Sequence, residues 1–133
     1  MRIAVIEDER PIREGLVHIL NKISPEYQVV GSAENGREGL ILLEEQDPDL
    51  ILLDIQMPDM NGLQMLKEAR ERGSMTKVVI LTAYSDFDYA KQALEANAVS
   101  YLLKPIEIEE FQKLMVSVIQ AINDDNKKDE IKQ

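Results

Sequence analysis

The sequence is poor in the residues on which most catalytic and metal sites depend. Its 133 residues include no cysteine and a single histidine, His18. Without cysteine the chain forms neither disulfides nor thiolate metal sites. With one histidine it cannot build a histidine-rich zinc site, nor a Ser-His or Cys-His catalytic pair that does not use His18. Because His18 falls off the apolar stripe of its helix, we expect it to be exposed and without function. The composition still leaves open a carboxylate site for a hard cation.

Positive charge and long apolar runs are also scarce. The chain has 15 Lys and Arg against 25 Asp and Glu, for a formal net charge of −10. Affinity for DNA phosphates and anionic membranes comes mostly from Lys and Arg, so direct contact with either is not expected. The apolar runs, such as 40–43, are far shorter than the roughly 20 residues that span a bilayer. The apolar stretch at the N-terminus is interrupted by Glu7 and Asp8 before it is long enough for a signal peptide. We therefore expect a cytoplasmic protein.

The spacing of the short apolar runs predicts an α/β protein. At roughly 150 residues per domain, the chain is one domain. Most of the runs are continuous, which is typical of strands buried on both faces of a parallel sheet. They alternate with segments of helical periodicity, and this order predicts helices on both faces of the sheet. The expected strands are 3–6, 28–32, 50–53, 78–81 and 101–103.

The segments between these runs carry helix signals. Pro11 suits a first helical turn, Asp86 can cap a helix, and the second and third helices are expected over about 35–46 and 61–73. From Asn123 the chain is polar and lacks an apolar stripe, so we expect 123–133 to form a linker or a frayed end. The apolar positions expected on the helix faces are Ile12, Leu16, Ile19, Leu20, Ile23, Leu40, Leu43, Ala90, Ala93, Leu94, Ile108, Phe111, Met115, Val118 and Ile122.

Chemically active side chains stand where four of the expected strands end. Glu7 and Asp8 follow the first strand and Asp54 follows the third. Thr82 follows the fourth and Lys104 the fifth. Ligands of open α/β sheets bind outside the carboxyl ends of the strands, so these side chains are expected to share one site.

Each type of group at these strand ends has a plausible task. Clustered carboxylates repel one another and favour a hard cation such as Mg²⁺. An aspartate can act as a nucleophile and form an aspartyl-phosphate. A metal and an ammonium group stabilise the charge of a transferring phosphoryl group, and a hydroxyl can donate a hydrogen bond to it.

Four motifs in this order and spacing resemble a known family. They are the acidic pair in VIEDE, then LLDIQMPDMNG, LTA and YLLKP. Together they make residues 1–122 similar to the receiver domain of bacterial two-component response regulators. The resemblance implies a flavodoxin-like (βα)5 three-layer sandwich with a five-stranded parallel sheet of order 2-1-3-4-5.

The resemblance also implies which residues hold the phosphoryl group and the metal. Asp54 is implied as the phosphorylated aspartate. Asp8 is implied as a direct ligand of Mg²⁺, or of Mn²⁺, with Glu7 supporting it directly or through water. The backbone carbonyl of Gln56 would supply a further ligand.

Further residues are implied to respond to phosphorylation. Thr82 would move toward the phosphoryl group, Lys104 would be its ion-pair partner, and Tyr101 would be the aromatic switch that turns inward. The Lys104–Pro105 bond is implied to be cis, and Tyr84 is implied to limit access of the hydrolytic water.

These implied roles predict a signalling switch that acts through other molecules. A sensor histidine kinase would phosphorylate the domain, which would change conformation on the face of the fourth helix, fifth strand and fifth helix, with homodimerisation as one consequence. The domain would catalyse only its own phosphorylation and slow autodephosphorylation. Transcription is the expected output, with DNA contacted only through an output domain outside this chain, and YSDFDYAKQAL resembles receivers attached to helix-turn-helix regulators of the arabinose-regulator type. The alternative is a stand-alone receiver that acts by protein contacts.

Other functions fit the sequence less well. A phosphatase of the haloacid-dehalogenase type places a second aspartate two residues after its nucleophile, where this chain has Gln56. A flavin-binding module of the same strand order binds the flavin phosphate after its first strand, where the acids 7–9 of this chain would repel it. A pseudo-receiver normally lacks an acid or the lysine, and all are present here. Individually, Thr82 can simply end a strand, and Tyr101 can be a half-buried strand tyrosine.

Overall fold

The sheet has the predicted strand order. We analysed a computed structural model that describes the backbone of residues 1–83 and 87–132 and the side chains of residues 1–83 and 88–125. Five strands pair in parallel in the order β2-β1-β3-β4-β5. In chain order the elements are β1 (Arg2–Ile6), α1 (Arg10–Ile23), β2 (Gln28–Ala33), α2 (Gly36–Gln46), β3 (Leu50–Asp54), α3 (Gly62–Glu71), β4 (Lys77–Thr82), α4 (Phe87–Glu95), β5 (Ser100–Leu103) and α5 (Ile108–Lys132).

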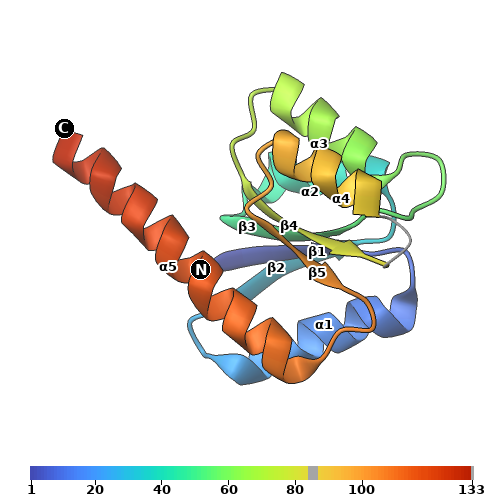
Figure 1. The fold of residues 1–133 in the computed structure, drawn as a ribbon, viewed down its shortest axis with the longest axis horizontal. Helices are drawn as coiled ribbons and strands as arrows, with labels where there is room; N and C mark the ends of the chain where they lie inside the picture. The colour runs from blue at the N-terminus through green and yellow to red at the C-terminus, as the bar shows by residue number, and fades with distance from the viewer. Residues whose placement is uncertain (84–86, 133) are drawn as a thin grey trace.

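The molecule has three layers, because each face of the sheet is covered by helices. Helices α1 and α5 lie on one face and α2, α3 and α4 on the other (Figure 1). Alternate residues of the central strands enter two separate cores: Ile3 and Leu52 pack with Phe111 of α5, whereas Ile6 and Leu53 pack with helices of the other face. This double burial explains why the strands are continuous apolar runs in the sequence.

Most of the predicted helix faces are buried, but two positions are exposed. Phe111 is completely buried, whereas Ile108 is 55% exposed because it is the first residue of α5, one turn before the buried stripe begins. Leu94 is 40% exposed, because α4 packs through the smaller side chains of Ala90 and Ala93. His18 is exposed, as predicted. The predicted cap Asp86 and the predicted access residue Tyr84 lie outside the described residues.

The polar C-terminal segment is helical, which differs from the expected linker or frayed end. Helix α5 continues from Ile108 to Lys132, and its last turns project away from the sheet (Figure 1). The segment contains no Gly or Pro that would end a helix, and Lys77 Nζ lies 3.0 Å from Asp125 Oδ2. The end of the domain at residue 122 stays a prediction.

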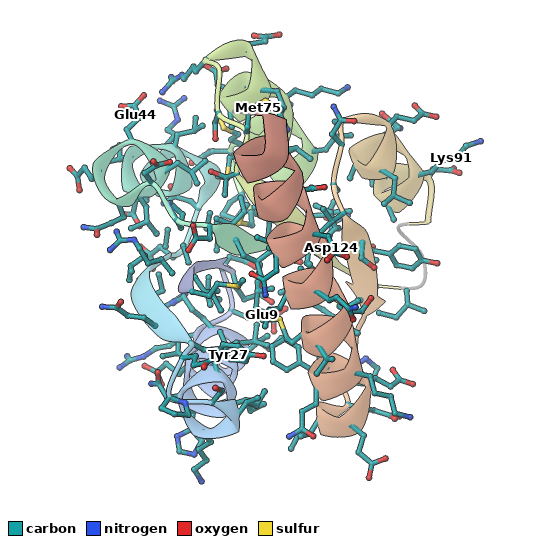
Figure 2. All side chains as sticks on the ribbon, turned by 90° about the vertical axis from the view of Figure 1, so that its left-hand side faces the viewer. Glu9, Tyr27, Glu44, Met75, Lys91 and Asp124 are labelled. Atoms are coloured by element: carbon teal, nitrogen blue, oxygen red, sulfur yellow. The ribbon has the colours of Figure 1, made fainter. Side chains whose placement is uncertain are left out.

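Charged side chains are exposed on several elements. Figure 2 shows Glu44, Lys91 and Asp124 on three different elements, each directed outward. Within the described part of the chain, no helix combines the length and apolar character that crossing a bilayer requires. The acids that depart from this pattern are the few that are buried, and they lie at the carboxyl ends of the strands.

Candidate functional site

The parallel sheet brings the predicted site residues to one edge. Asp54 is the last residue of β3 and Thr82 the last of β4. Glu7 follows β1, where its N–H donates to the carbonyl of Ala33 at 3.0 Å. Lys104 follows β5 and donates its N–H to the carbonyl of Thr82 at 2.8 Å. These main-chain bonds extend the sheet ladders by one residue and so hold the four side chains in register.

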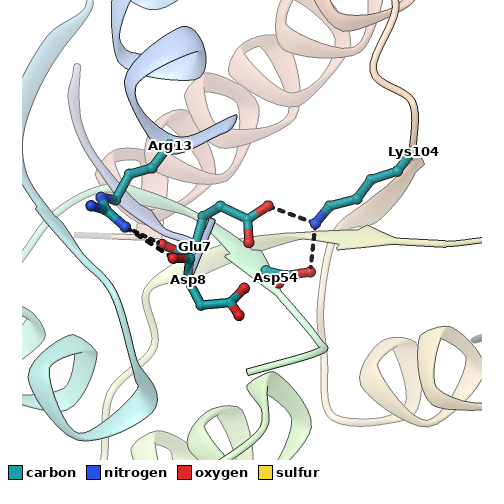
Figure 3. A network of polar contacts seen from close by, with 5 residues as sticks. All are labelled: Glu7, Asp8, Arg13, Asp54 and Lys104. Atoms are coloured by element: carbon teal, nitrogen blue, oxygen red, sulfur yellow. Dashed lines mark hydrogen bonds and ion pairs between the residues drawn. The ribbon is translucent and has the colours of Figure 1, made fainter. Parts of the chain in front are cut away.

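Lys104 bridges two buried carboxylates. Its Nζ lies 2.6 Å from Oε1 of Glu7 and 3.0 Å from Oδ1 of Asp54 (Figure 3). Glu7 is completely buried and Asp54 is only 3% exposed. The strand ends therefore place two desolvated acids against one ammonium group, which leaves the negative charge in excess.

The acids form a site that suits a hard cation. Carboxylate oxygens of Glu7, Asp8 and Asp54 all lie within 4.8 Å of one another. The second oxygen of Glu7, Oε2, is buried without a hydrogen-bond partner. A buried carboxylate oxygen without a partner is costly, and a cation with oxygen preference would satisfy it. The residues present therefore fit Mg²⁺ or Mn²⁺.

The electrostatics of the site depend on which groups are charged. Burial and the neighbouring carboxylate of Glu7 raise the pKa of Asp54 well above its ordinary value, and Lys104 only partly opposes them. Burial acts to lower the pKa of Lys104, but its hydrogen bond to Glu7 and the charge of Asp54 raise it on balance. Lys104 is therefore held as a cation, while the carboxyl group of Asp54 ionises less readily than that of an ordinary aspartate.

Thr82 ends β4, the strand next to that of Asp54, whereas Tyr101 lies on β5 at the edge of the sheet. The Thr82 side chain is buried, and its hydroxyl donates to the carbonyl of Ala83 at 3.1 Å. Tyr101 is 37% exposed on β5, where the alternation of side chains buries Leu102 instead. Gln56 is exposed on the loop after β3. Its carbonyl as a metal ligand and the switch roles of Thr82 and Tyr101 stay predictions.

The loop after Asp54 is fixed by local bonds. The side chain of Asn61 accepts from the N–H of Gln64 at 2.8 Å, and the Gln64 side chain accepts from the N–H of Asn61 at 2.9 Å. This capping box starts α3. Gly62 packs so closely under Asp54 that a Cβ atom there would overlap the Asp54 carbonyl oxygen. The close approach explains why a residue without a side chain stands there.

One residue at the site escaped the sequence analysis. Arg13 of α1 donates from Nη1 to the carbonyl of Glu7 at 2.8 Å and to that of Asp8 at 3.5 Å (Figure 3). A basic residue one turn into the helix that follows the acidic pair is the only signal the sequence offers. The cis Lys104–Pro105 bond implied by the resemblance is present.

Comparison with known proteins points to a single family. A model of the response regulator receiver domain matches residues 3–116. The chain is 39% identical to the uncharacterized transcriptional regulatory protein YhcZ of Bacillus subtilis and 38% identical to the nitrate/nitrite response regulator protein NarL of Escherichia coli, in each case over 85% of this chain and 52% of the relative. The chain thus spans about half the length of these relatives. The solved structure of the REC domain of AraT, a response regulator from Geobacillus stearothermophilus, has a TM-score of 0.84 at 30% identity, covering 94% of this chain and 97% of that one.

Proposed function

The chain belongs to the response regulator receiver domain family, and from this membership we propose that Asp54 accepts a phosphoryl group from a sensor histidine kinase. The observation that carries the proposal is the placement of Asp54. It is a buried carboxylate at a strand end, 3.0 Å from an ammonium group and within 4.8 Å of two further acids. A phosphatase of the haloacid-dehalogenase type would need a second aspartate where this chain has Gln56, and a flavin phosphate would meet the acids 7–9.

The transfer is a substitution at phosphorus. An Asp54 oxygen forms the new P–O bond while the P–N bond to the kinase histidine breaks, and the imidazole nitrogen keeps the electron pair. Because only the ionised carboxylate is a nucleophile, the raised pKa of Asp54 has to be overcome before transfer. Lys104 contributes to this, since its charged Nζ already contacts Asp54 and remains there as negative charge develops on the phosphoryl oxygens.

The acidic cluster makes the reaction dependent on a divalent cation. Asp8 and Asp54 would hold Mg²⁺ or Mn²⁺ directly, and Glu7 would support it through its unpaired Oε2 or through water. When bound, the cation supplies positive charge that offsets the acids and the incoming phosphoryl oxygens. In Figure 3, Lys104 and Asp8 lie on different sides of Asp54. The ammonium group of Lys104 and a cation held by Asp8 would therefore not compete for one position.

Phosphorylation would then shift the domain between two conformations. A phosphoryl group adds a charge of about −1.5 to −2 and three acceptor oxygens. The Thr82 hydroxyl, which now donates to a carbonyl, would turn to these oxygens, and Tyr101 would leave its outward position for the space released. The change would be read on the α4–β5–α5 face. Exposed large apolar residues on these elements are Tyr89, Leu94, Tyr101, Leu103, Ile108 and Val116.

Transcription is the output that the relatives favour. One solved relative is described as a DNA-binding response regulator of the LuxR family, and two curated relatives are described as transcriptional regulatory proteins. With its net charge of −10, this chain would not contact DNA itself. DNA contact would come from a further domain, and homodimerisation through the α4–β5–α5 face would couple phosphorylation to it. A receiver that acts only by protein contacts is the alternative.

The phosphoryl transfer can be tested with a small phosphodonor. We expect acetyl phosphate and Mg²⁺ to add the mass of one phosphoryl group to the intact protein, and EDTA to prevent it. Asp54→Ala should abolish the adduct, whereas Asp59→Asn should retain it, because it neutralises an exposed acid of the neighbouring loop and asparagine tolerates the positive φ of this position. No adduct on the wild-type protein, or an adduct that survives Asp54→Ala, would falsify the proposal.

A further inference from the structure

Arg13 lies one turn from the start of α1, where the helix dipole does not favour a cation. Helix α1 begins with Arg10 and has no acidic residue in its first turn. Its N-cap, Glu9, makes no side-chain capping bond. Because the N-terminus of a helix carries partial positive charge, acidic residues are stabilising there and basic residues are not. The helix dipole therefore does not account for a cation at Arg13, whereas its contacts with the neighbouring loop do.

These contacts are with the main chain of the acidic loop. Nη1 of Arg13 lies 2.8 Å from the carbonyl oxygen of Glu7 and 3.5 Å from that of Asp8. Both acceptors are carbonyl oxygens rather than carboxylates, so Arg13 leaves the negative charge of the cluster in place. Figure 3 shows the guanidinium on one side of the loop and the Asp8 carboxylate on the other, next to Asp54.

These bonds complete a three-point attachment of the residue that begins the loop. The N–H of Glu7 donates to Ala33 of β2 at 3.0 Å, its carbonyl accepts from Arg13, and its carboxylate accepts from Lys104 at 2.6 Å. The side chain of the next residue, Asp8, is partly exposed and makes no hydrogen bond or ion pair with the residues that the structure describes. Its direction therefore depends on how the peptide plane before it is held.

We propose that Arg13 is a positioning residue of the cation site, whose guanidinium holds the 7–8 carbonyls and thereby aims the Asp8 carboxylate at Asp54. The inference rests on the proposed Mg²⁺ dependence of the site. Groups that orient metal ligands typically change metal affinity by 10–100-fold when they are removed. Arg13 acts before phosphorylation, because it sets the geometry that the cation meets.

The sign of the effect separates positioning from simple electrostatics. Removing a positive charge beside three acids would, by Coulomb's law alone, strengthen the binding of a cation. Removing a group that aims a ligand weakens it. We therefore expect Arg13→Met to raise the Kd for Mg²⁺ about 10-fold, and Arg13→Lys, which keeps the charge and one donor, to recover part of the affinity.

The experiment is calorimetric titration of the full chain with MgCl₂, without a phosphodonor. Arg10→Met is the matched control, because Arg10 is an exposed basic residue of the same helix whose partner is Glu14. It should leave the Kd unchanged or slightly lower. In a parallel acetyl phosphate assay, high Mg²⁺ should restore the initial rate of Arg13→Met, since the defect lies in cation affinity.

The outcomes distinguish this inference from the proposed function. An Arg13→Met protein that binds Mg²⁺ as tightly as the wild type, or more tightly, would overturn the role of Arg13 alone. A wild-type chain that binds no Mg²⁺ would contradict the proposed function as well. If circular dichroism shows that Arg13→Met does not fold, Arg13→Gln, which is also neutral and too short for the same contacts, has the same expected and refuting results.

Discussion

Replacing Asp54 with asparagine should stabilise the metal-free protein, although it removes an ion pair. Asp54 is 3% exposed, and its burial and the adjacent Glu7 raise its pKa from 3.8 to about 8 against the opposing effect of Lys104. The environment therefore favours a neutral group at this position. Asparagine supplies one of nearly the same shape, and Lys104 keeps its 2.6 Å contact with Glu7.

The sign of the pH dependence follows from proton linkage. The folded state binds the Asp54 proton more tightly than the unfolded state, so the stability that this group provides is lost as the pH rises from about 4 through its raised pKa. Each tenfold difference in proton affinity corresponds to about 1.4 kcal/mol, which makes several kcal/mol the upper limit at pH 8. Allowing for relaxation and the lost Lys104 contact, we expect Asp54→Asn to gain about 2 kcal/mol at pH 8.

The assay is thermal unfolding followed by circular dichroism in EDTA at several pH values. About 2 kcal/mol corresponds to a Tm increase of roughly 5–10 °C for a domain of this size. The increase should shrink as the pH is lowered to 5, and Mg²⁺ should raise the Tm of the wild type more than that of Asp54→Asn. The exposed acid Glu45 provides the control Glu45→Gln, which should show no such trend. A lower Tm for Asp54→Asn at pH 8, or a gain that is independent of pH, would refute the reasoning.

Three further substitutions test what holds the site in place. Gly62→Ala should destabilise the protein by about 3 kcal/mol or more in urea unfolding, because the new methyl group meets the Asp54 carbonyl; a change below 1 kcal/mol would show that the loop yields easily. Asn61→Ala should lose about 1 kcal/mol by removing the capping box of α3, with Asn21→Ala, at an exposed position of α1, as a neutral comparison. Arg70 donates to four main-chain carbonyls and thereby joins the end of α3 to the segments before β4 and after α4. Arg70→Met should therefore lower the free energy of unfolding by about 2 kcal/mol and accelerate hydrogen exchange in α4. Unchanged exchange in α4 would argue against that link.

The sequence was most informative for the strands, and above all for β1, β3 and β4, which are buried on both faces of the sheet. The short apolar runs predicted all five strands, and the structure moves no strand end by more than one residue. The sequence did not show which positions near the ends of a helix are buried, because a periodic pattern does not show where a helix leaves the sheet. Ile108 and Leu94 follow the expected periodicity and are exposed all the same. The polar segment after Asn123 has no apolar stripe, and its helix depends on continuation from α5 and on the contact with Lys77.

The sequence by itself determined which groups stand at the strand ends, because a parallel sheet sends the carboxyl ends of its strands to one edge whatever their loops do. It could not determine how those groups pair. Glu7 and Lys104 are separated by 97 positions in the chain, and their contact depends on how helices and strands pack. The same packing determines the unpaired oxygen of Glu7 and the hydrogen bonds of Arg13 to the loop. Side-chain distances of a few ångströms are set by that packing, and so is the balance of burial and charge that raises the pKa of Asp54.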